Sequence, residues 1–358
     1  MIKVLMCGNH PSNKGGMTSV ISQLMSYDWK KKNVSMKYIS TFYPSNNIVK
    51  SGYFMLSYFR ILAALIIYKP DIVHMHMSYK GSFYRKFMIH KMCKRFGIKD
   101  VIHLHGSEFE KWYNETDKKT QEKIRRLLRE ADAFFVLGQK WKSIVEKIEP
   151  HVNAVVVTNS VPIPKESVSW NKEQCQILYM GVLIPRKGVK NLLEALCILK
   201  ESDQLGTLKA VIAGTGPEEA ELKEYCKKKN LEEIIRFYGW IGGNRKKELI
   251  LESQIGVLPS YNEGLPVSVL EEISYGMPVI ASRVGDIETA VKDGENGCLV
   301  DPGVPEQIAE KLKIVRKKDV FLKMSEKSRE LAEKEFAEEK FFEKITKYYT
   351  KLCGEQDI

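Results

Sequence analysis

The sequence lacks the patterns that mark several common classes of protein. It contains seven cysteines in 358 residues, and no two of them form a C-x-x-C pair. Scattered cysteines in odd number are typical of a reducing compartment and argue against a disulfide framework or a structural zinc site. The fingerprint G-x-G-x-x-G is absent, and no acidic residue follows the second candidate strand, VSMKYIS. A nicotinamide dehydrogenase is therefore not expected.

Long apolar runs are scarce as well. Residues 1–7, MIKVLMC, resemble a strand and include no apolar region long enough for a secretory signal. The nearest candidate for a membrane span, Tyr53–Tyr68, is shorter than about 20 residues and is interrupted by Arg60. We expect this segment to be a buried helix, and the protein to be cytoplasmic.

Acidic residues are few in the first half of the chain. Residues 1–165 carry 27 Lys and Arg against 12 Asp and Glu, whereas the remainder carries 29 against 33. This bias indicates an anionic partner for the first half. No recognised nucleic-acid-binding motif is present, so nucleic acid is not expected. Ser78–Lys99 and Lys30–Lys32 interleave aromatic and basic residues, as either a surface for anionic lipid or a solvated basic helix would.

Short β-rich runs alternate with helical patterns along the whole chain. The first half contains IKVLMC, VSMKYIS, DIVHMH, DVIHLH, AFFVLG and AVVVTN, and the second contains CQILYMG, LKAVIAG, IIRFYG, QIGVLPS, MPVIAS and GCLV. Apolar strands that alternate with helices predict parallel sheets covered on both faces. The expected fold class is therefore α/β, with two Rossmann-like doubly wound domains that face a cleft.

A segment rich in proline and serine, Asn159–Gln174, interrupts this alternation. We place the boundary there and expect a first domain over residues 1–165 and a second over 166–339. The last segment, 340–358, is amphipathic and helical and is expected to pack back on the first domain.

Four of the seven histidines form two H-x-H pairs at strand ends, His74/His76 and His103/His105. Period-two spacing places both members of a pair on one face of a strand, which is the arrangement of many metal ligands. A metal-dependent hydrolase is thus one interpretation. No Asp or Cys at comparable strand ends completes a coordination sphere, and the chain contains no D-x-D. A packed core role is equally compatible with the pattern.

Three loops carry residues suited to a phosphorylated ligand. Gly15 and Gly16 precede a helix and allow close approach of an anion to its N-terminus. Arg186 and Lys187 follow a strand in GVLIPRKG and suit a diphosphate. In YNEGLPVSVLEE, Glu263 precedes a helix expected over Pro266–Tyr275.

Helical phase separates the two later carboxylates of that segment. A turn of about 100° per residue places Glu271 at the border of the apolar arc and Glu272 on the opposite side. Glu271 is thus the better candidate for a ligand-binding residue. A glycoside hydrolase would need Glu263 and Glu271 to face each other across one bond, which a loop and a helix are not expected to provide.

The residues PSYNEGLPVSVLEEISYGMPVIAS, together with HLHGSE, NSVP, GVLIPRKGV, AGTGP and FYGW in that order, resemble the retaining glycosyltransferases of family 4. The likeness extends over most of the chain. It implies the GT-B fold and transfer of a sugar from a nucleotide-sugar donor to a saccharide acceptor. The acceptor would be linked to a lipid such as a polyprenyl diphosphate, in the synthesis of bacterial surface polysaccharide or glycoconjugate at the inner face of the membrane.

The resemblance also implies roles for particular residues. Glu263 would bind hydroxyls of the donor sugar, and Glu271 those of the ribose. Lys187 would neutralise the diphosphate with the N–H groups of Gly264 and Leu265. The other positions that match are Gly16 at the phosphates, His105 beside the sugar and Trp240 near the base. Such enzymes need no metal or other cofactor, and a UDP-sugar is favoured over a GDP-sugar as the co-substrate.

Two positions depart from the family pattern. Where members often have Arg after the glycine of the GRL motif, this chain has Val182, and we expect Arg186 to supply the charge instead. Where many members read GGIPE, this chain reads GDIET, so Glu288 is out of register and receives no role.

Overall fold

The computed structural model describes residues 1–354 and divides the chain into two compact units. Unit 1 comprises Met1–Asn159 and the segment from Glu339 onward, and unit 2 comprises Ser160–Glu338. The expected boundary after residue 165 lies a few residues beyond this division. All twelve β-rich runs identified in the sequence form strands in the described part of the chain.

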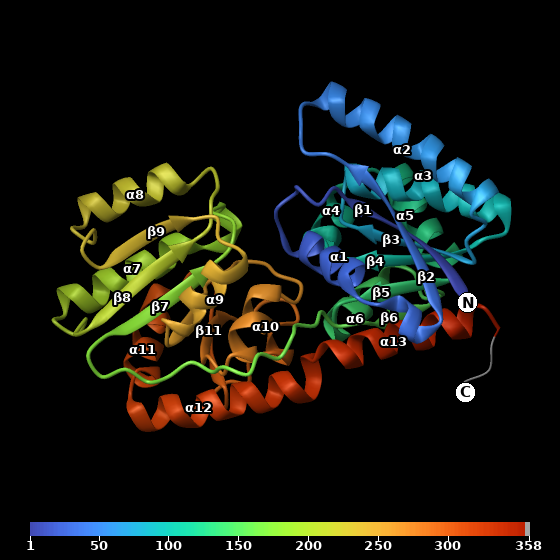
Figure 1. Cartoon of the computed structure of the whole chain (residues 1–358). Coiled ribbons are helices and arrows are strands. Elements are labelled where there is room, and N and C mark those ends of the chain that lie inside the picture. Colours follow the sequence, from blue (N-terminus) through green and yellow to red (C-terminus); the bar gives the residue numbers. More distant parts are fainter. Residues whose placement is uncertain (355–358) are drawn as a thin grey trace. The chain divides into compact units, whose positions relative to one another are not determined.

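Unit 1 is built on a parallel sheet of six strands among the described residues, in the order β2-β1-β3-β4-β5-β6 (Figure 1). Its strands are β1 (Ile2–Asn9), β2 (Val34–Phe42), β3 (Ile72–Met77), β4 (Lys99–Leu104), β5 (Ala133–Val136) and β6 (Ala154–Val156). The helices between them are α1 (Gly16–Ser26), η1 (Trp29–Lys32), α2 (Asn47–Ile67), α3 (Gly81–Phe96), α4 (Phe109–Glu115), α5 (Lys118–Glu130) and α6 (Gln139–Ile148). The central strands are buried along their length because helices cover both faces.

Unit 2 repeats this architecture with the strand order β12-β11-β10-β7-β8-β9 within the described residues. Its strands are β7 (Cys175–Met180), β8 (Leu208–Ala213), β9 (Ile235–Gly239), β10 (Ile255–Leu258), β11 (Val279–Ser282) and β12 (Gly297–Val300). The helices are η2 (Pro185–Lys187), α7 (Val189–Glu201), α8 (Glu219–Lys228), α9 (Gly243–Leu251), α10 (Val267–Ser274), η3 (Ile287–Thr289), α11 (Pro305–Val315), α12 (Lys318–Leu331) and η4 (Ala332–Phe336).

Both sheets have a topological switch point. In unit 2 the chain runs outward from β7 through β8 to β9 and then returns to the other side of β7 with β10. The loops after β7 and β10 therefore diverge at the carboxyl ends of two adjacent strands. Crevices of this kind are where open α/β sheets bind ligands. In unit 1 the same reversal lies between β1 and β3.

The last helix, α13 (Glu338–Leu352), completes unit 1 and confirms the expected return of the C-terminal segment. Its buried side chains include Phe342 and Tyr349. The Phe342 ring stacks on Tyr27 with ring centroids 3.7 Å apart, and the Tyr349 hydroxyl lies 2.6 Å from His74 Nδ1. The helix thus covers side chains that come from α1 and β3.

Helix α2 differs from what the sequence predicted. The expected buried segment Tyr53–Tyr68 is part of a helix of 21 residues, Asn47–Ile67, of which Ser57, Ile61 and Leu65 are buried. By length and composition this helix is long and apolar enough to cross a membrane. Most of its apolar side chains face away from unit 1, so the prediction of a buried helix is wrong.

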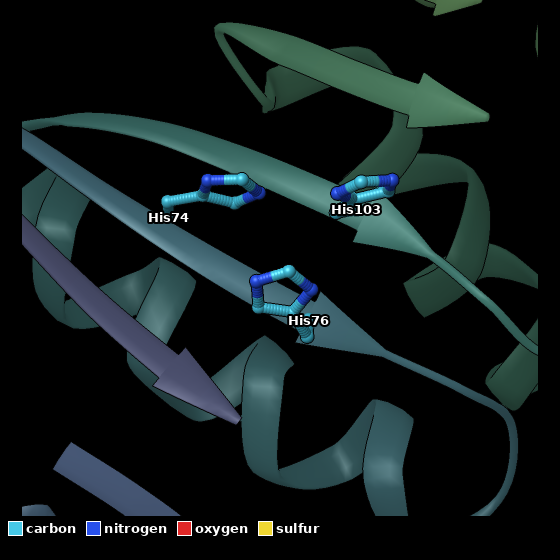
Figure 2. Close-up of side chains that lie close together, drawn as sticks. All are labelled: His74, His76 and His103. Atoms are coloured by element: carbon cyan, nitrogen blue, oxygen red, sulfur yellow. The ribbon is translucent and has the colours of Figure 1, made fainter. Parts of the chain in front are cut away.

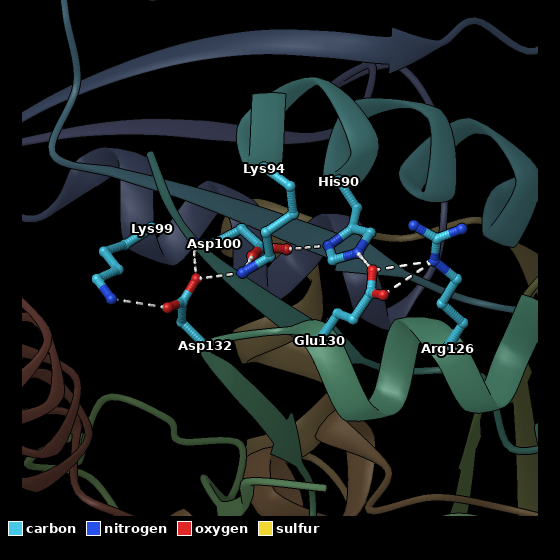
Figure 3. Close-up of polar contacts among 7 residues, drawn as sticks. All are labelled: His90, Lys94, Lys99, Asp100, Arg126, Glu130 and Asp132. Atoms are coloured by element: carbon cyan, nitrogen blue, oxygen red, sulfur yellow. Dashed lines mark hydrogen bonds and ion pairs between the residues drawn. The ribbon is translucent and has the colours of Figure 1, made fainter. Parts of the chain in front are cut away.

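A polar network joins α3, β4, α5 and the start of β5 at the amino ends of the strands (Figure 3). The buried carboxylate of Asp100 lies 2.8 Å from His90 Nδ1 and 3.0 Å from Lys94 Nζ. Asp132 accepts from Lys94 at 2.7 Å and from Lys99 at 3.0 Å. Two cations of the expected basic surface, Lys94 and Lys99, are therefore held in ion pairs. A third, Lys86, is buried.

Candidate functional site

The cations of unit 2 lie in a turn that the local sequence determines. Pro185 begins the short helix η2, which contains Arg186 and Lys187 and ends at Gly188 with φ +62°. A Cβ atom at Gly188 would lie 2.1 Å from the carbonyl oxygen of Pro259. Glycine at this position thus permits both the left-handed backbone and the close packing of this turn on the loop after β10.

Glu263 lies in that loop and is directed toward the same turn. Its side chain is about 7% exposed and its Oε1 accepts from Lys187 Nζ at 2.5 Å and from Ser260 Oγ at 2.7 Å. Arg186 approaches the other oxygen at 3.7 Å and donates to the Asn262 carbonyl oxygen. The predicted residues Arg186, Lys187 and Glu263 therefore meet at the switch point between β7 and β10.

A third loop, after β11, fixes the backbone at Glu263. Gly285 has φ +55°, and a Cβ atom there would lie 2.1 Å from the carbonyl oxygen of Glu263. The Asp286 N–H donates to the carbonyl oxygen of Gly264 at 3.0 Å. Gly264 and Leu265 are both buried. The chain entering α10 is thus held by loops that come from three adjacent strands.

Helix α10 separates Glu271 from Glu272 in a way that the sequence predicted only in part. Glu271 is partly exposed and pairs with Lys246 of α9. Glu272 is 2% exposed, and its Oε2 lies so close to Gly256 of β10 that a Cβ atom there would be 2.3 Å away. Burial, and then the charge of Glu271, raise the pKa of Glu272 well above its ordinary value. The expectation that Glu272 points away from the core is wrong.

Lys246 was not identified from the sequence. It lies in the first turn of α9, after the glycine pair Gly242–Gly243, in the run NRKKEL. A cation among neighbouring lysines on a polar helix has no feature that singles it out. The glycine pair before a helix is the one signal that resembles the loops already considered.

The remaining residues of the predicted donor site are more distant in the topology. Trp240 follows β9, which β8 separates from β7, and its side chain is 42% exposed. At Val182 the carbonyl oxygen accepts from the Tyr179 hydroxyl at 3.0 Å. Arg186, which we expected to replace the arginine absent at position 182, approaches Glu263.

Gly16 and His105 belong to unit 1. Gly16 begins α1, and Gly15 before it has φ +139° and accepts from the N–H groups of Thr18 and Ser19. His105 follows β4 and its N–H donates to the carbonyl oxygen of Met77 at 2.8 Å. Both lie at the carboxyl ends of strands in this sheet.

The four strand-end histidines of unit 1 lie side by side. His74, His76 and His103 are completely buried (Figure 2), and His105 is partly exposed. The Nδ1 of His76 shares a hydrogen bond of 2.8 Å with His105 Nε2. Burial lowers the pKa of His74 to about 3 and those of His76 and His103 well below the ordinary value. These imidazoles are therefore neutral at physiological pH.

The donor set of this cluster fits a divalent metal poorly. In the described part of the chain, His74 Nε2, His76 Nε2 and both nitrogens of His103 have no hydrogen-bond partner. The ligand atoms of the three residues lie within 4.8 Å of one another. Their ring planes, however, are within about 31° of parallel, so the in-plane lone pairs do not converge well.

The cluster is more consistent with a packed histidine core. Unpaired buried nitrogens of this kind are commonly satisfied by ordered water. No comparison with known proteins supports the alternative of a metal-dependent hydrolase.

The sequence of unit 2 matches a known family. Residues 161–335 match the family described as Glycosyl transferases group 1. The match spans just under half of the chain, so unit 2 is similar to group 1 glycosyl transferases. The match covers almost all of unit 2, including η2, the Glu263 loop and α10.

Curated relatives are similar over parts of their length. An uncharacterized glycosyltransferase of Haemophilus influenzae is 30% identical over 206 residues, which are 56% of this chain and 57% of the relative. The putative glycosyltransferase EpsD of Bacillus subtilis is 27% identical over 319 residues, or 82% of this chain and 80% of the relative. Alignments with two others span 36% and 35% of the relatives' length.

Solved structures share the fold of the whole chain. Sucrose-phosphate synthase from Thermosynechococcus elongatus superposes with a TM-score of 0.84 at 16% identity, over 99% of this chain and 100% of that one. Anabaena HepE, in complex with UDP, superposes with a TM-score of 0.78 at 14% identity, over 98% and 100%. These neighbours are glycosyltransferases of the GT-B type, so the expected fold is confirmed.

Proposed function

We propose that this protein transfers a sugar from a nucleotide-sugar donor to a saccharide acceptor. The observation that carries the proposal is the meeting of Glu263 with Lys187 and Arg186 at the switch point of unit 2, the part of the chain that is similar to group 1 glycosyl transferases. A carboxylate accepts from vicinal sugar hydroxyls, and two adjacent cations suit a diphosphate. One partly buried site thus offers groups for both halves of the donor.

The proposed roles follow from the chemistry of each group. Glu263 binds hydroxyls of the donor sugar, and Glu271 accepts from the ribose. Lys187 and Arg186 neutralise the diphosphate, so Lys187 exchanges part of its pairing with Glu263 for the phosphate oxygens when the donor binds. The N–H groups of Gly264 and Leu265 contribute to the same anion, and Lys246 orients Glu271.

Three further residues complete the proposal. Gly16 allows close approach of the donor phosphates to the N-terminus of α1. His105 is partly exposed as a residue, but desolvation of its ring lowers the imidazole pKa to about 3. It therefore provides a polar group beside the transferred sugar without adding charge. Trp240 offers an exposed ring on which the base can stack.

The reaction we propose retains the anomeric configuration and needs no metal. The bond between the anomeric carbon and the donor phosphate oxygen breaks, and a bond to the acceptor hydroxyl oxygen forms on the same face. The acceptor proton passes to the departing phosphate oxygen. Arg186 and Lys187 stabilise the charge that develops on this oxygen, which is the task that a divalent cation performs in other phosphate sites.

We further propose a UDP-sugar as donor and a lipid-linked saccharide as acceptor, used at the cytoplasmic face of a membrane. HepE has been crystallised with UDP and with UDP-glucose. Among the relatives is an amylovoran biosynthesis glycosyltransferase of Erwinia amylovora, 24% identical over 253 residues. These likenesses support a role in bacterial polysaccharide synthesis.

The donor is tested by thermal shift with UDP, GDP, ADP and their sugars. A ligand that binds the folded protein raises its Tm by mass action. We expect the largest shift with UDP compounds, and no shift with any nucleotide would contradict the proposal. Glu306→Ala, an exposed carboxylate on α11, is the control for variants of the site.

Two variants separate the roles of the carboxylates. Glu271→Ala removes contacts made by substrate and transition state alike and should raise the KM for the donor about tenfold, whereas Glu263→Ala should lower kcat by at least that factor. Initial rates at varied donor concentration measure both. Equal changes in KM and kcat for the two variants would contradict the separate roles.

A further inference from the structure

The outer face of α2 is an apolar surface that the described residues of unit 1 leave uncovered. Among its residues, Ile48 is 85% exposed and Ile67 is 81% exposed. The exposed large apolar side chains of the helix are Ile48, Val49, Met55, Leu56, Phe59, Ile66 and Ile67. Single exposed apolar residues are ordinary, but a contiguous apolar face of this length indicates an interaction surface.

These side chains share one side of the helix. At about 100° per residue, Ile48, Met55, Phe59 and Ile66 fall within about 40° of one line along the helix axis. Leu56, Ala63 and Ile67 extend the same arc, and Arg60 lies at its edge. The opposite side carries Ser57, Ile61 and Leu65, which are buried where α2 packs on β2 and α3.

The charged residues in the sequence around α2 are almost all basic. Residues 29–99 contain 14 Lys and Arg and a single acidic residue, Asp71. Lys50, Arg60 and Lys69 lie on or next to α2, and Lys91 and Arg95 are exposed on α3. An apolar helix face set among cations matches a bilayer that carries anionic headgroups, because the acyl region receives the apolar side chains and the headgroups receive the cations.

We propose that α2 lies in the plane of an anionic lipid surface with its outer face inserted between the headgroups. A crossing of the bilayer does not fit the fold. The strands on both sides of α2, β2 and β3, pair with β1 in one parallel sheet, so both ends of the helix return to the same body. The segment Ser78–Lys99, expected to carry this role, contributes three exposed cations, Lys80, Lys91 and Arg95. Its Lys86, Lys94 and Lys99 are buried or paired.

This inference does not rest on sugar transfer. Lipid binding by α2 requires neither donor nor acceptor, so it is measured on the protein alone. A failed donor assay leaves it intact, and absence of lipid binding leaves the donor site intact.

The test is sedimentation of the full chain with vesicles of phosphatidylcholine, with and without phosphatidylglycerol. We expect binding to the anionic vesicles at low salt, weaker binding at high salt, and little to neutral vesicles. The variant Met55→Gln/Phe59→Gln/Ile66→Gln should lower the affinity at least tenfold. Its matched control is Ile314→Gln/Leu322→Gln, which removes exposed apolar side chains from α11 and α12 of unit 2 and should bind as the wild type does.

A second variant guards against loss of folding. Phe59→Trp places an indole on the outer face, and its fluorescence should shift to shorter wavelength when anionic vesicles are added. An unchanged spectrum, or equal binding by wild type and the triple variant, overturns the proposal. A dimer that the triple variant abolishes, without lipid binding by the wild type, would assign the face to a second copy of the chain and also overturn it.

Discussion

At the scale of single residues, the proposed donor site combines local patterns that the sequence displays with contacts that it does not. Glu263, Lys187 and Glu271 were predicted from a family signature and from helix phase. Lys246 and the burial of Glu272 were not. Periodicity identifies which arc of α10 is most apolar but not how much of the helix is covered, and α10 packs against both β10 and α12. Coverage from two sides leaves no solvated face for Glu272.

The burial of Glu272 predicts an unusual effect of pH. Its pKa is raised in the folded state, so the unfolded chain releases the proton first and stability falls as pH rises above about 4.5. Glu272→Gln stays neutral in both states and should become more stable than the wild type as pH increases toward 8. Urea unfolding at pH 5 and pH 8 measures this, with Glu306→Gln as control. A difference between the variants that does not grow with pH would show that Glu272 is ionised.

The histidine core predicts instability in acid. Its members have lowered folded pKa values, so the unfolded chain binds more protons below about pH 6.5 and stability is lost as pH falls from there. The loss is about 1.4 kcal/mol per pH unit for each histidine at most. His103→Phe should make the fall in Tm between pH 6.5 and 5 shallower, and His151→Gln, an exposed position, should not. Parallel curves for wild type and His103→Phe would contradict this account.

At the scale of elements, strands and helices were predictable to different degrees. Every strand was located because parallel strands are apolar on both faces and are separated by polar or glycine-containing turns. The environment of α2 was not predictable. An apolar helix in a globular domain is ordinarily buried. Composition alone does not distinguish a core helix from one whose apolar face binds a lipid surface.

The loop after β11 provides a prediction about the site. Gly285→Ala adds a Cβ atom against the Glu263 carbonyl oxygen at a position with positive φ, so the Glu263 loop must move. We expect donor affinity to fall about tenfold, measured by titration with the preferred nucleotide. Gly294→Ala is the matched control, because that residue also has positive φ, +78°, but no atom within 4 Å of the added Cβ. Equal loss in both variants would indicate backbone strain and not displacement of Glu263.

At the scale of the whole molecule, each unit has its own core and its own switch point, and α13 belongs to the unit that begins the chain. Two doubly wound domains were predicted because the alternation of strands and helices restarts after residue 174. Contacts between residues far apart in the sequence were not predicted. The hydrogen bond of His74 with Tyr349 is an example, because such a pairing leaves no local pattern.

The hydrogen bond between α13 and β3 should contribute measurably to the stability of unit 1. Tyr349→Phe leaves His74 Nδ1 without the hydroxyl and should cost about 1 kcal/mol of stability. Tyr348→Phe, which keeps the ring beside Phe135, should cost little. Hydrogen exchange of amides in β3 reports on unit 1 alone, which avoids assuming one transition for two units. Equal exchange in the two variants would contradict the role of the hydroxyl.

The position of α13 also has a consequence for synthesis. Unit 2 is one continuous stretch of chain, so its sheet can close as soon as the ribosome has released it. Unit 1 precedes unit 2 in the chain but lacks the helix that covers Tyr27 and His74 until unit 2 and then α13 have been made. During translation its histidine core therefore lacks this cover while unit 2 forms downstream, so the earlier of the two units is the later to be finished.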